Sequence, residues 1–310
     1  MNIRQLKQFV SIAETGSISR SAKEQNISQP ALTRSVKNLE EDLGVELIER
    51  RSNGVFLTDF GHHLLEYARC IVNDSERVRR EILAMKAGVR GTISIGVGPS
   101  FSTRFLSATL ERLFKRGADL EVHLVEGFVE DLCGELRNGS LDAVLSLFPE
   151  SFDSSDLAFT KLCDVESVLS AGSNHRLAHS TNVTRAQLAQ CNWVLADQKY
   201  VASAFREFLG GTLKPSHVHH IRANSIRLIK NLVLESDYLT IVPKILIEHE
   251  LETEELVVID GPVKPLVSVG GIATRKTGFR PEGLVDLIRI IKDEFSLTPD
   301  TLAFHKYELG

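Results

Sequence analysis

The sequence lacks the features of a membrane protein and of the common enzyme families. No apolar run approaches the ~20 residues of a transmembrane helix, and the first residues lack the apolar core of a signal peptide. No G-x-S-x-G, H-E-x-x-H or phosphate-binding P-loop motif occurs. We therefore expect a cytosolic protein that binds no membrane, needs no cofactor and is not an enzyme.

Cysteine is scarce, and an excess of positive charge is absent. The four cysteines, Cys70, Cys133, Cys163 and Cys191, form no C-x-x-C pair, so we expect free thiols packed as small hydrophobic groups. The chain carries 36 Lys and Arg against 41 Asp and Glu, a net charge of −5. Residues 1–90 hold 14 of these cations and 12 of the anions, a net of +2. Nucleic-acid binding would therefore depend on a few well-placed cations rather than on bulk charge.

Residues 3–44 carry the pattern of three helices. The spacing of apolar residues predicts a first helix over 3–14, which ends before Gly16. Ser19 is the expected N-cap of a short second helix over 20–25. Ser28 is the expected N-cap of a third helix, with Gly44 at its end. This arrangement is typical of a helix-turn-helix, which we place at residues 18–37.

The third helix has one apolar stripe and one polar face. The stripe is formed by residues at steps of 4, 3 and 4: Leu32, Val36, Leu39 and Leu43. If the stripe is buried, the outward residues are Gln29, Pro30, Thr33, Arg34 and Lys37. Arg and Lys can bind guanine edges or phosphate, and Gln can bind adenine, so we expect this face to read the major groove. For this helix alone, an ordinary solvated face is an equal alternative.

A β-hairpin is expected after the third helix. Residues 47–50 and 55–57 are strand-like, and Asn53-Gly54 between them is the strongest short hairpin signal. Arg50 and Arg51 lie near its tip, where we expect them to contact phosphate, which positions a protein without specifying sequence. Ser19 and Arg20, at the start of the second helix, are expected to hold phosphate in the same way.

A long helix is predicted from about residue 59 to 87. It contains a sustained heptad seam: Leu64, Ala68, Ile71, Ser75, Val78, Ile82 and Met85. Such a seam favours pairing with the same helix of a second copy of the chain. The alternative is a long helix packed on its own domain. Residues 87–91 are expected to form a short hinge.

Strand-like and helix-like stretches alternate beyond the hinge. Strands are expected at 92–97, 120–125 and 143–147, with helices at 103–115 and 129–137 between them. This β-α-β-α-β order is typical of a parallel sheet covered by helices. A second series of strands and helices begins after about residue 161 and continues to a final helix at 281–295.

Together these residues resemble the LysR-type transcriptional regulators. The match is most specific over residues 1–65, where it rests on Phe9, Ala13, Gly16-Ser17, Ala22, Ser28-Gln29-Pro30-Ala31-Leu32, Leu39-Glu40, Leu43-Gly44, Leu47-Ile48-Glu49-Arg50, Leu57-Thr58 and Gly61. Looser matches follow at 141–143 and 241–243. The resemblance implies a winged helix-turn-helix, a dimerising linker helix, and an α/β effector domain folded like a type 2 periplasmic binding protein. It also implies a homotetramer built from two homodimers.

The resemblance gives expected domain limits and a function. We place the DNA-binding domain at 1–58, the linker helix at 59–88 and the effector-binding domain at 89–310. Within the last, we expect subdomain I at about 91–161 and 268–310, and subdomain II at about 162–267. The implied function is sequence-specific binding of double-stranded promoter DNA, switched by a small molecule between the subdomains. The alternatives are a non-specific architectural DNA binder, and an enzyme or solute-binding protein with an incidental helical domain.

A glycine-rich turn at 96–102 marks the expected effector site. It begins like a dinucleotide-binding G-x-G-x-x-G motif, but Phe101 replaces the third glycine and Pro99 removes a backbone donor. We expect Ser100 and Ser102 instead to form a donor-rich corner with Phe101 at the sheet edge. The resemblance implies that Ser100 contacts the effector, whereas plain helix capping is the alternative for Ser102.

The other effector-binding positions come from the resemblance. They are Phe128, Leu147, Tyr200, Val201 and Asn224. Phe128 stands where the family commonly has Ser or Thr, and Leu147 stands where some members carry Arg. These departures favour an aromatic or largely apolar effector with one polar group over a small dicarboxylate.

Two remaining clusters carry weaker hypotheses. His217, His219 and His220 are conceivable metal ligands, but half-exposed strand histidines are the preferred interpretation. Cys163 and Cys191 are 28 residues apart and do not match the closer pair of the family's peroxide sensors. We therefore expect neither a metal site nor redox sensing.

Overall fold

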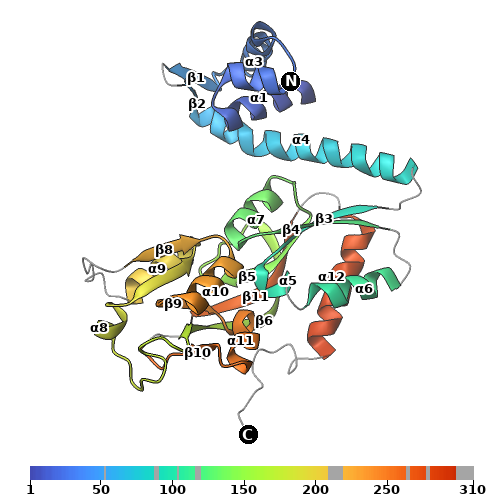
Figure 1. Ribbon diagram of the computed structural model, residues 1–310. Helices are drawn as coiled ribbons and strands as arrows, with labels where there is room; N and C mark the ends of the chain where they lie inside the picture. The colour runs from blue at the N-terminus through green and yellow to red at the C-terminus, as the bar shows by residue number, and fades with distance from the viewer. Residues whose placement is uncertain are drawn as a thin grey trace. The chain divides into compact units, whose positions relative to one another are not determined.

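A computed structural model describes residues 1–51, 54–86, 91–102, 105–115, 120–208, 219–262, 266–276 and 280–297. These residues fall into two compact units (Figure 1). Met1–Thr92 with Gly134–Leu141 form one unit, and the remaining described residues form the other. No described helix is both long enough and apolar enough to cross a bilayer.

Three helices form the first part of the N-terminal unit: α1 (Ile3–Thr15), α2 (Ile18–Glu24) and α3 (Gln29–Leu43). Asn2 and Gln5 form a capping box at the start of α1, and the Ser28 side chain accepts a hydrogen bond from Ala31 N at the start of α3. Ser17, rather than Ser19, is the N-cap of α2. The prediction for Ser19 was wrong because α2 begins two residues earlier than expected.

The core of this unit confirms most of the apolar stripe expected on α3. Leu32, Val36 and Leu39 are fully buried against Phe9 and other residues of α1 and α2. Leu43 is 40% exposed, so its predicted burial was wrong. Leu43 is the last residue of α3, immediately before Gly44, whose backbone is left-handed. No further turn of the helix follows to cover its side chain.

The wing and the linker helix follow α3. The wing consists of β1 (Ile48–Arg51) and β2 (Gly54–Leu57), which pair antiparallel, and the expected turn residue Asn53 lies outside the described residues. Helix α4 (Asp59–Lys86) confirms the long helix. Of its heptad seam, Ala68 is buried, whereas Ile71, Val78, Ile82 and Met85 are 40–69% exposed. Of the hinge predicted at 87–91, residues 87–90 lie outside the described residues.

One mixed sheet forms the centre of the second unit, in the order β4-β3-β5-β11-β6-β9-β7-β8, with β10 paired to β6. Its strands are β3 (Thr92–Val97), β4 (Glu121–Glu126), β5 (Ala143–Pro149), β6 (Leu157–Gly172), β7 (Asn192–Ala196), β8 (His220–Ala223), β9 (Tyr238–Pro243), β10 (Leu256–Val258) and β11 (Leu266–Arg275). Pairs β3–β5, β7–β8 and β7–β9 are parallel, and for β3–β5 this confirms the prediction from the alternating pattern. The long strands β6 and β11 are antiparallel to their neighbours. This central pair was not predicted.

Helices pack on this sheet around two separate apolar cores. They are α5 (Pro99–Ser102), α6 (Leu106–Lys115), α7 (Val129–Arg137), α8 (Arg185–Leu188), α9 (Lys199–Phe208), α10 (Ile226–Glu235), a 3-10 turn (Lys244–Ile247), α11 (Glu248–Glu252) and α12 (Glu282–Leu297). One core lies beneath α6 and α12, which are side by side in Figure 1, and includes Ile93 and Ile290. The other surrounds Trp193 and Ile229.

Candidate DNA-binding face and ligand pocket

The outer face of α3 is polar and accessible. Gln29, Pro30, Arg34 and Lys37 are exposed, whereas Thr33 is half-buried. This face lies opposite the buried stripe because helical residues three and four apart share a side. The spacing argument therefore gave the correct exposure for four of these five residues, with Thr33 at the margin.

Several expected DNA-contacting side chains already have partners within the protein. Arg20 Nε lies 3.1 Å from Glu24 Oε1, Lys37 Nζ lies 3.5 Å from Glu41 Oε1, and Arg51 pairs at 2.7 Å with Glu49 while lying over the Phe56 ring. The Ser19 hydroxyl donates to Gln29 Oε1 at 3.0 Å, which links the first turns of α2 and α3. Exposed pairs of this kind are weak, so the cations can still exchange a carboxylate for phosphate.

Two cations of the face have no such partner. Among the described residues, no carboxylate oxygen lies within 4.0 Å of the guanidinium of Arg34 or of Arg50. Arg34 is exposed on α3, and Arg50 is exposed on the wing. Among the cations expected to contact DNA, they are therefore the most readily available.

Glu40 connects the recognition helix to the wing. Its Oε1 atom accepts hydrogen bonds from Leu47 N at 2.8 Å and from Ile48 N at 3.2 Å. On the other side of the wing, Val55 N donates to Gly16 O at 2.9 Å. These bonds hold the hairpin against both α3 and the turn after α1. Glu40 belongs to the family pattern, but its role was not predicted, because the fold that brings Leu47 back to α3 is not visible in the spacing of residues.

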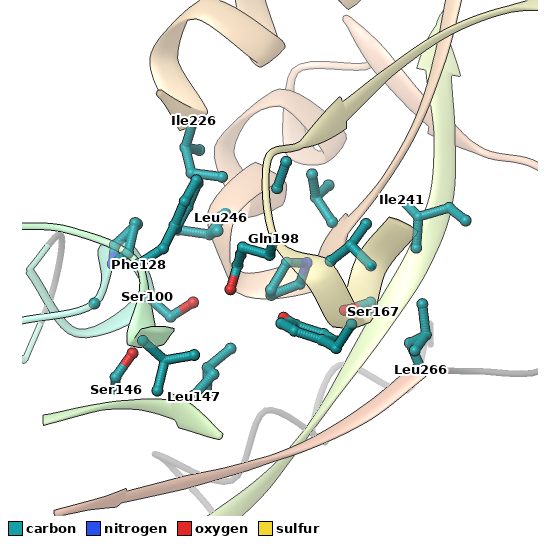
Figure 2. Close-up of a pocket in the computed structure, with 18 residues that line it drawn as sticks. Ser100, Phe128, Ser146, Leu147, Ser167, Gln198, Ile226, Ile241, Leu246 and Leu266 are labelled. Carbon is teal, nitrogen blue, oxygen red and sulfur yellow. The ribbon is translucent and has the colours of Figure 1, made fainter. Parts of the chain in front are cut away.

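A pocket lies in the second unit where the ends of several elements meet (Figure 2). Five of the eight expected effector-binding residues line it: Ser100, Phe128, Leu147, Tyr200 and Val201. They come from α5, the start of α7, β5 and the start of α9. Elements more than 90 residues apart in sequence thus contribute walls to one cavity.

The other three expected residues do not line the pocket. Phe101 is 1% exposed and packs in the core with Phe105 and Phe295. The Ser102 hydroxyl donates to Pro99 O at 3.1 Å and to Glu126 Oε1 at 2.9 Å. Asn224 is exposed and lies outside the lining. Of the three residues expected on α5, only Ser100 lines the cavity.

Sequence reasoning missed most of the lining. The missed residues are Gly98, Pro99, Val129, Ser146, Ser167, Ala196, Gln198, Ile226, Ile241, Val242, Pro243, Leu246 and Leu266. Gln198 follows the carboxyl end of β7, a position where ligands gather in such sheets, and this signal could have found it. Ser146 and Ser167 lie inside strands, and nothing in their spacing indicates a pocket.

The pocket is narrow, largely apolar and has several polar groups in its walls. Its empty volume is about 550 Å³, which includes space open to solvent. Burial raises the pKa of the Tyr200 phenol, a hydrogen bond to Ser268 opposes the rise, and the charge of Glu130 adds to it. Tyr200 is therefore a neutral phenol in this wall.

Both units match models of one family. Residues 3–62 match the bacterial regulatory helix-turn-helix protein of the lysR family, and residues 86–296 match the LysR substrate binding domain. The chain belongs to the LysR family of bacterial transcription regulators. It is thus a DNA-binding transcription regulator with an effector-binding domain, and not an enzyme.

Individual members show how far the likeness extends. The uncharacterized HTH-type transcriptional regulator YvbU of Bacillus subtilis (strain 168) is 30% identical over 234 residues, which cover 74% of this chain and 78% of that protein. A hydrogen peroxide-inducible genes activator of Pectobacterium carotovorum subsp. carotovorum is 28% identical over 82% of this chain and 83% of its own. The crystal structure of full-length CbnR complexed with its target DNA is 20% identical, covers 94% of this chain and 99% of that one, and gives a TM-score of 0.59.

Two cysteines of this LysR-family chain, Cys163 and Cys191, are poorly suited to ionise. Burial raises the pKa of Cys163 to about 12, and the neighbouring Asp164 carboxylate adds to the rise. Burial also raises the pKa of Cys191, although Arg176 lies 3.2 Å from its sulfur. All four cysteines are free thiols. Because the thiolate is the reactive form, these environments disfavour oxidation.

The histidines expected on a strand do not form a described metal site. His219 and His220 are exposed, and His217 lies outside the described residues. Within the described part of the chain, no three His, Cys, Asp or Glu side chains are grouped as metal ligands. The His220 ring instead packs edge-on against Phe205.

Proposed function

We propose that this regulator binds specific promoter sites in the cytoplasm through α3 and the wing. The proposed base-contacting residues are Gln29, Pro30, Thr33, Arg34 and Lys37, with phosphate contacts from Ser19, Arg20, Ser28, Arg50 and Arg51. The supporting observation is the accessible polar face of α3 opposite a fully buried stripe. Arg34 carries the greatest weight because it is exposed on that face and has no carboxylate within 4.0 Å among the described residues.

We propose that two copies pair through α4 into a homodimer, and that two dimers form a tetramer. Ile71, Val78, Ile82 and Met85 are separated by heptad spacing and are 40–69% exposed in the single chain. Large apolar side chains exposed along one seam favour pairing with a matching helix. Pairing also supplies the second recognition helix that a palindromic operator requires.

We propose that a small effector binds in the pocket and changes the relation between the two apolar cores of the second unit. Phe128 supports this, because it immediately precedes α7, lines the pocket and packs in the core around Trp193. A ligand shifts such an equilibrium only if it binds one arrangement more tightly than the other. Within this proposal, residues 1–58 bind DNA, 59–88 pair the copies, and 89–310 bind the effector.

Selection from a randomised DNA pool tests the DNA-binding proposal. The full-length protein should enrich one palindrome-like sequence, and fluorescence anisotropy should then give an affinity ~10³-fold or more above that for bulk DNA. Equal affinity for bulk DNA would instead indicate an architectural binder. Failure to retard any DNA at moderate salt would favour a solute-binding protein with an incidental helical domain.

A further inference from the structure

We propose that the pocket takes an uncharged, largely apolar ligand with one hydrogen-bonding group, and that it discriminates against carboxylates. This proposal rests on the proposed function only in taking the pocket as the effector site. Three features of the pocket carry it: the charge of its wall, the occupation of the helix ends around it, and the polar groups left without partners.

The described residues of the wall carry no formal charge. None of the 18 lining residues is Lys, Arg, His, Asp or Glu. The sequence neighbours Lys199 and Lys244 are exposed and do not contribute to the lining. An anion moved from water into such a wall loses its hydration without gaining a counter-ion, which strongly disfavours the charged form.

Two of the helix N-termini beside the pocket, those of α9 and α10, already have partners within the protein. The first N–H of α9, at Lys199, donates to Glu130 Oε1 at 3.0 Å. The N-terminus of α10 is capped by Ser225, whose Oγ accepts from Leu228 N at 3.4 Å. Helix dipoles and free N–H groups are the usual way to hold a carboxylate without a cation, and here a protein carboxylate takes that place. A ligand carboxylate near α9 would meet the like charge of Glu130.

Two buried polar side chains remain available to a neutral group. Ser100 is 4% exposed and Gln198 is 9% exposed, and the side chain of neither forms a hydrogen bond with another described residue. Figure 2 shows the Ser100 hydroxyl and the Gln198 side chain pointing into the same space, with Ser146 close to Ser100. A hydroxyl and an amide both donate and accept, so they match an alcohol, amide or carbonyl. A ligand that forms hydrogen bonds with both side chains keeps them paired when it displaces solvent from the pocket.

Matched acid and amide probes test the proposal on the full-length protein. Isothermal titration would compare benzamide with benzoate, cinnamide with cinnamate, and octanamide with octanoate at pH 7.5, where the acids are anionic. We expect at least one amide to bind about tenfold or more tightly than its acid. Equal or tighter binding of the acids would overturn the proposal, and so would the absence of binding by all six probes. Neither result bears on DNA binding, which the selection experiment measures separately.

Variants of the wall should change this preference in a defined direction. Leu147→Arg places a cation in the wall and should reverse the preference toward the acid, whereas the apolar control Leu147→Met should keep it. Ile226→Lys, at the half-buried start of α10, repeats the test if Leu147→Arg fails to fold. Ser100→Ala with Gln198→Leu should weaken amide binding about tenfold or more. An unchanged preference in a folded cationic variant would contradict the proposal.

Discussion

The two units of this protein build their sites in opposite ways. The candidate DNA-binding face comes from one stretch, residues 19–51, and its side chains point away from a core that its own helices complete. The ligand pocket collects residues from Gly98 to Leu266, carried by strand ends and helix starts throughout the second unit. The first site is therefore set by helical periodicity, and the second by sheet topology.

This difference predicts different responses to mutation. On the exposed face, a side chain can be removed without disturbing its neighbours. In the pocket, each wall residue is also part of a packed core or lies next to one, as Phe128 shows. Substituting a glycine that lies against a neighbouring segment of the chain should therefore destabilise one unit and leave the other intact. Such substitutions are expected to have the largest effects.

Gly61→Ala should have the largest effect. A Cβ at this first-turn residue of α4 would lie 2.1 Å from Leu47 O, a backbone atom that cannot move without displacing the wing. We expect a loss of at least ~1–3 kcal/mol in local stability and a corresponding loss of DNA binding. Hydrogen exchange should accelerate in α3 and remain unchanged in β5. Gly134→Ala is the control, because its methyl meets nothing within 4 Å.

Gly98→Ala should produce the reciprocal result. Its Cβ would lie 2.3 Å from Ser146 Oγ and 3.1 Å from Ser146 Cα, so β5 must shift at the pocket. We expect ~1–3 kcal/mol of destabilisation confined to the second unit, with DNA binding retained. Exchange in β5 should accelerate while α3 keeps its protection. Accelerated exchange in both units would show that they do not respond separately.

The same contrast explains how much the sequence could predict. The α3 stripe and the exposure of its outer face follow from a 3.6-residue period, and only its end at Leu43 was misjudged. The central antiparallel pair β6–β11 escaped prediction because its partners are about 100 residues apart. Phe101 and Asn224 do not line the pocket for a related reason. The resemblance gave only their positions along the chain, whereas lining the pocket depends on how the short helix α5 and the end of β8 orient their side chains.

Arg34→Ala should weaken operator binding without affecting stability. The side chain is exposed and has no carboxylate within 4.0 Å among the described residues, so its removal leaves no buried group unsatisfied. Loss of a base contact should cost ~1–3 kcal/mol of discrimination, and loss of one phosphate contact would lower the salt slope by ~0.9. Anisotropy titrations at several salt concentrations measure both. If affinity and slope both stay the same, the assignment of this face is wrong.

Glu40→Ala should act on DNA binding through the wing. It removes the acceptor of Leu47 N and Ile48 N, and bonds to a charged acceptor contribute ~1.5–3 kcal/mol each at most in protein interiors. Because Glu40 is only half-buried, we expect a smaller loss, with reduced exchange protection at these two amides. Glu40→Gln keeps a carbonyl acceptor and should recover much of the protection. A role independent of the wing would leave these amides unaffected.

The smallest expected effect is that of peroxide, and it tests whether this chain differs from the relative described as a hydrogen peroxide-inducible genes activator. With a pKa of about 12, Cys163 is ionised in only about one molecule in ten thousand at pH 8, and Cys191 is also shifted away from the thiolate. Peroxide should therefore leave the operator affinity unchanged, and Cys163→Ser with Cys191→Ser should behave like the parent. Mass spectrometry after iodoacetamide treatment should find both residues unmodified in the folded protein and modified after denaturation. Rapid modification in the folded state would mean that the core of the second unit opens to solvent. The ligand pocket would then be as accessible to solvent as the DNA-binding face.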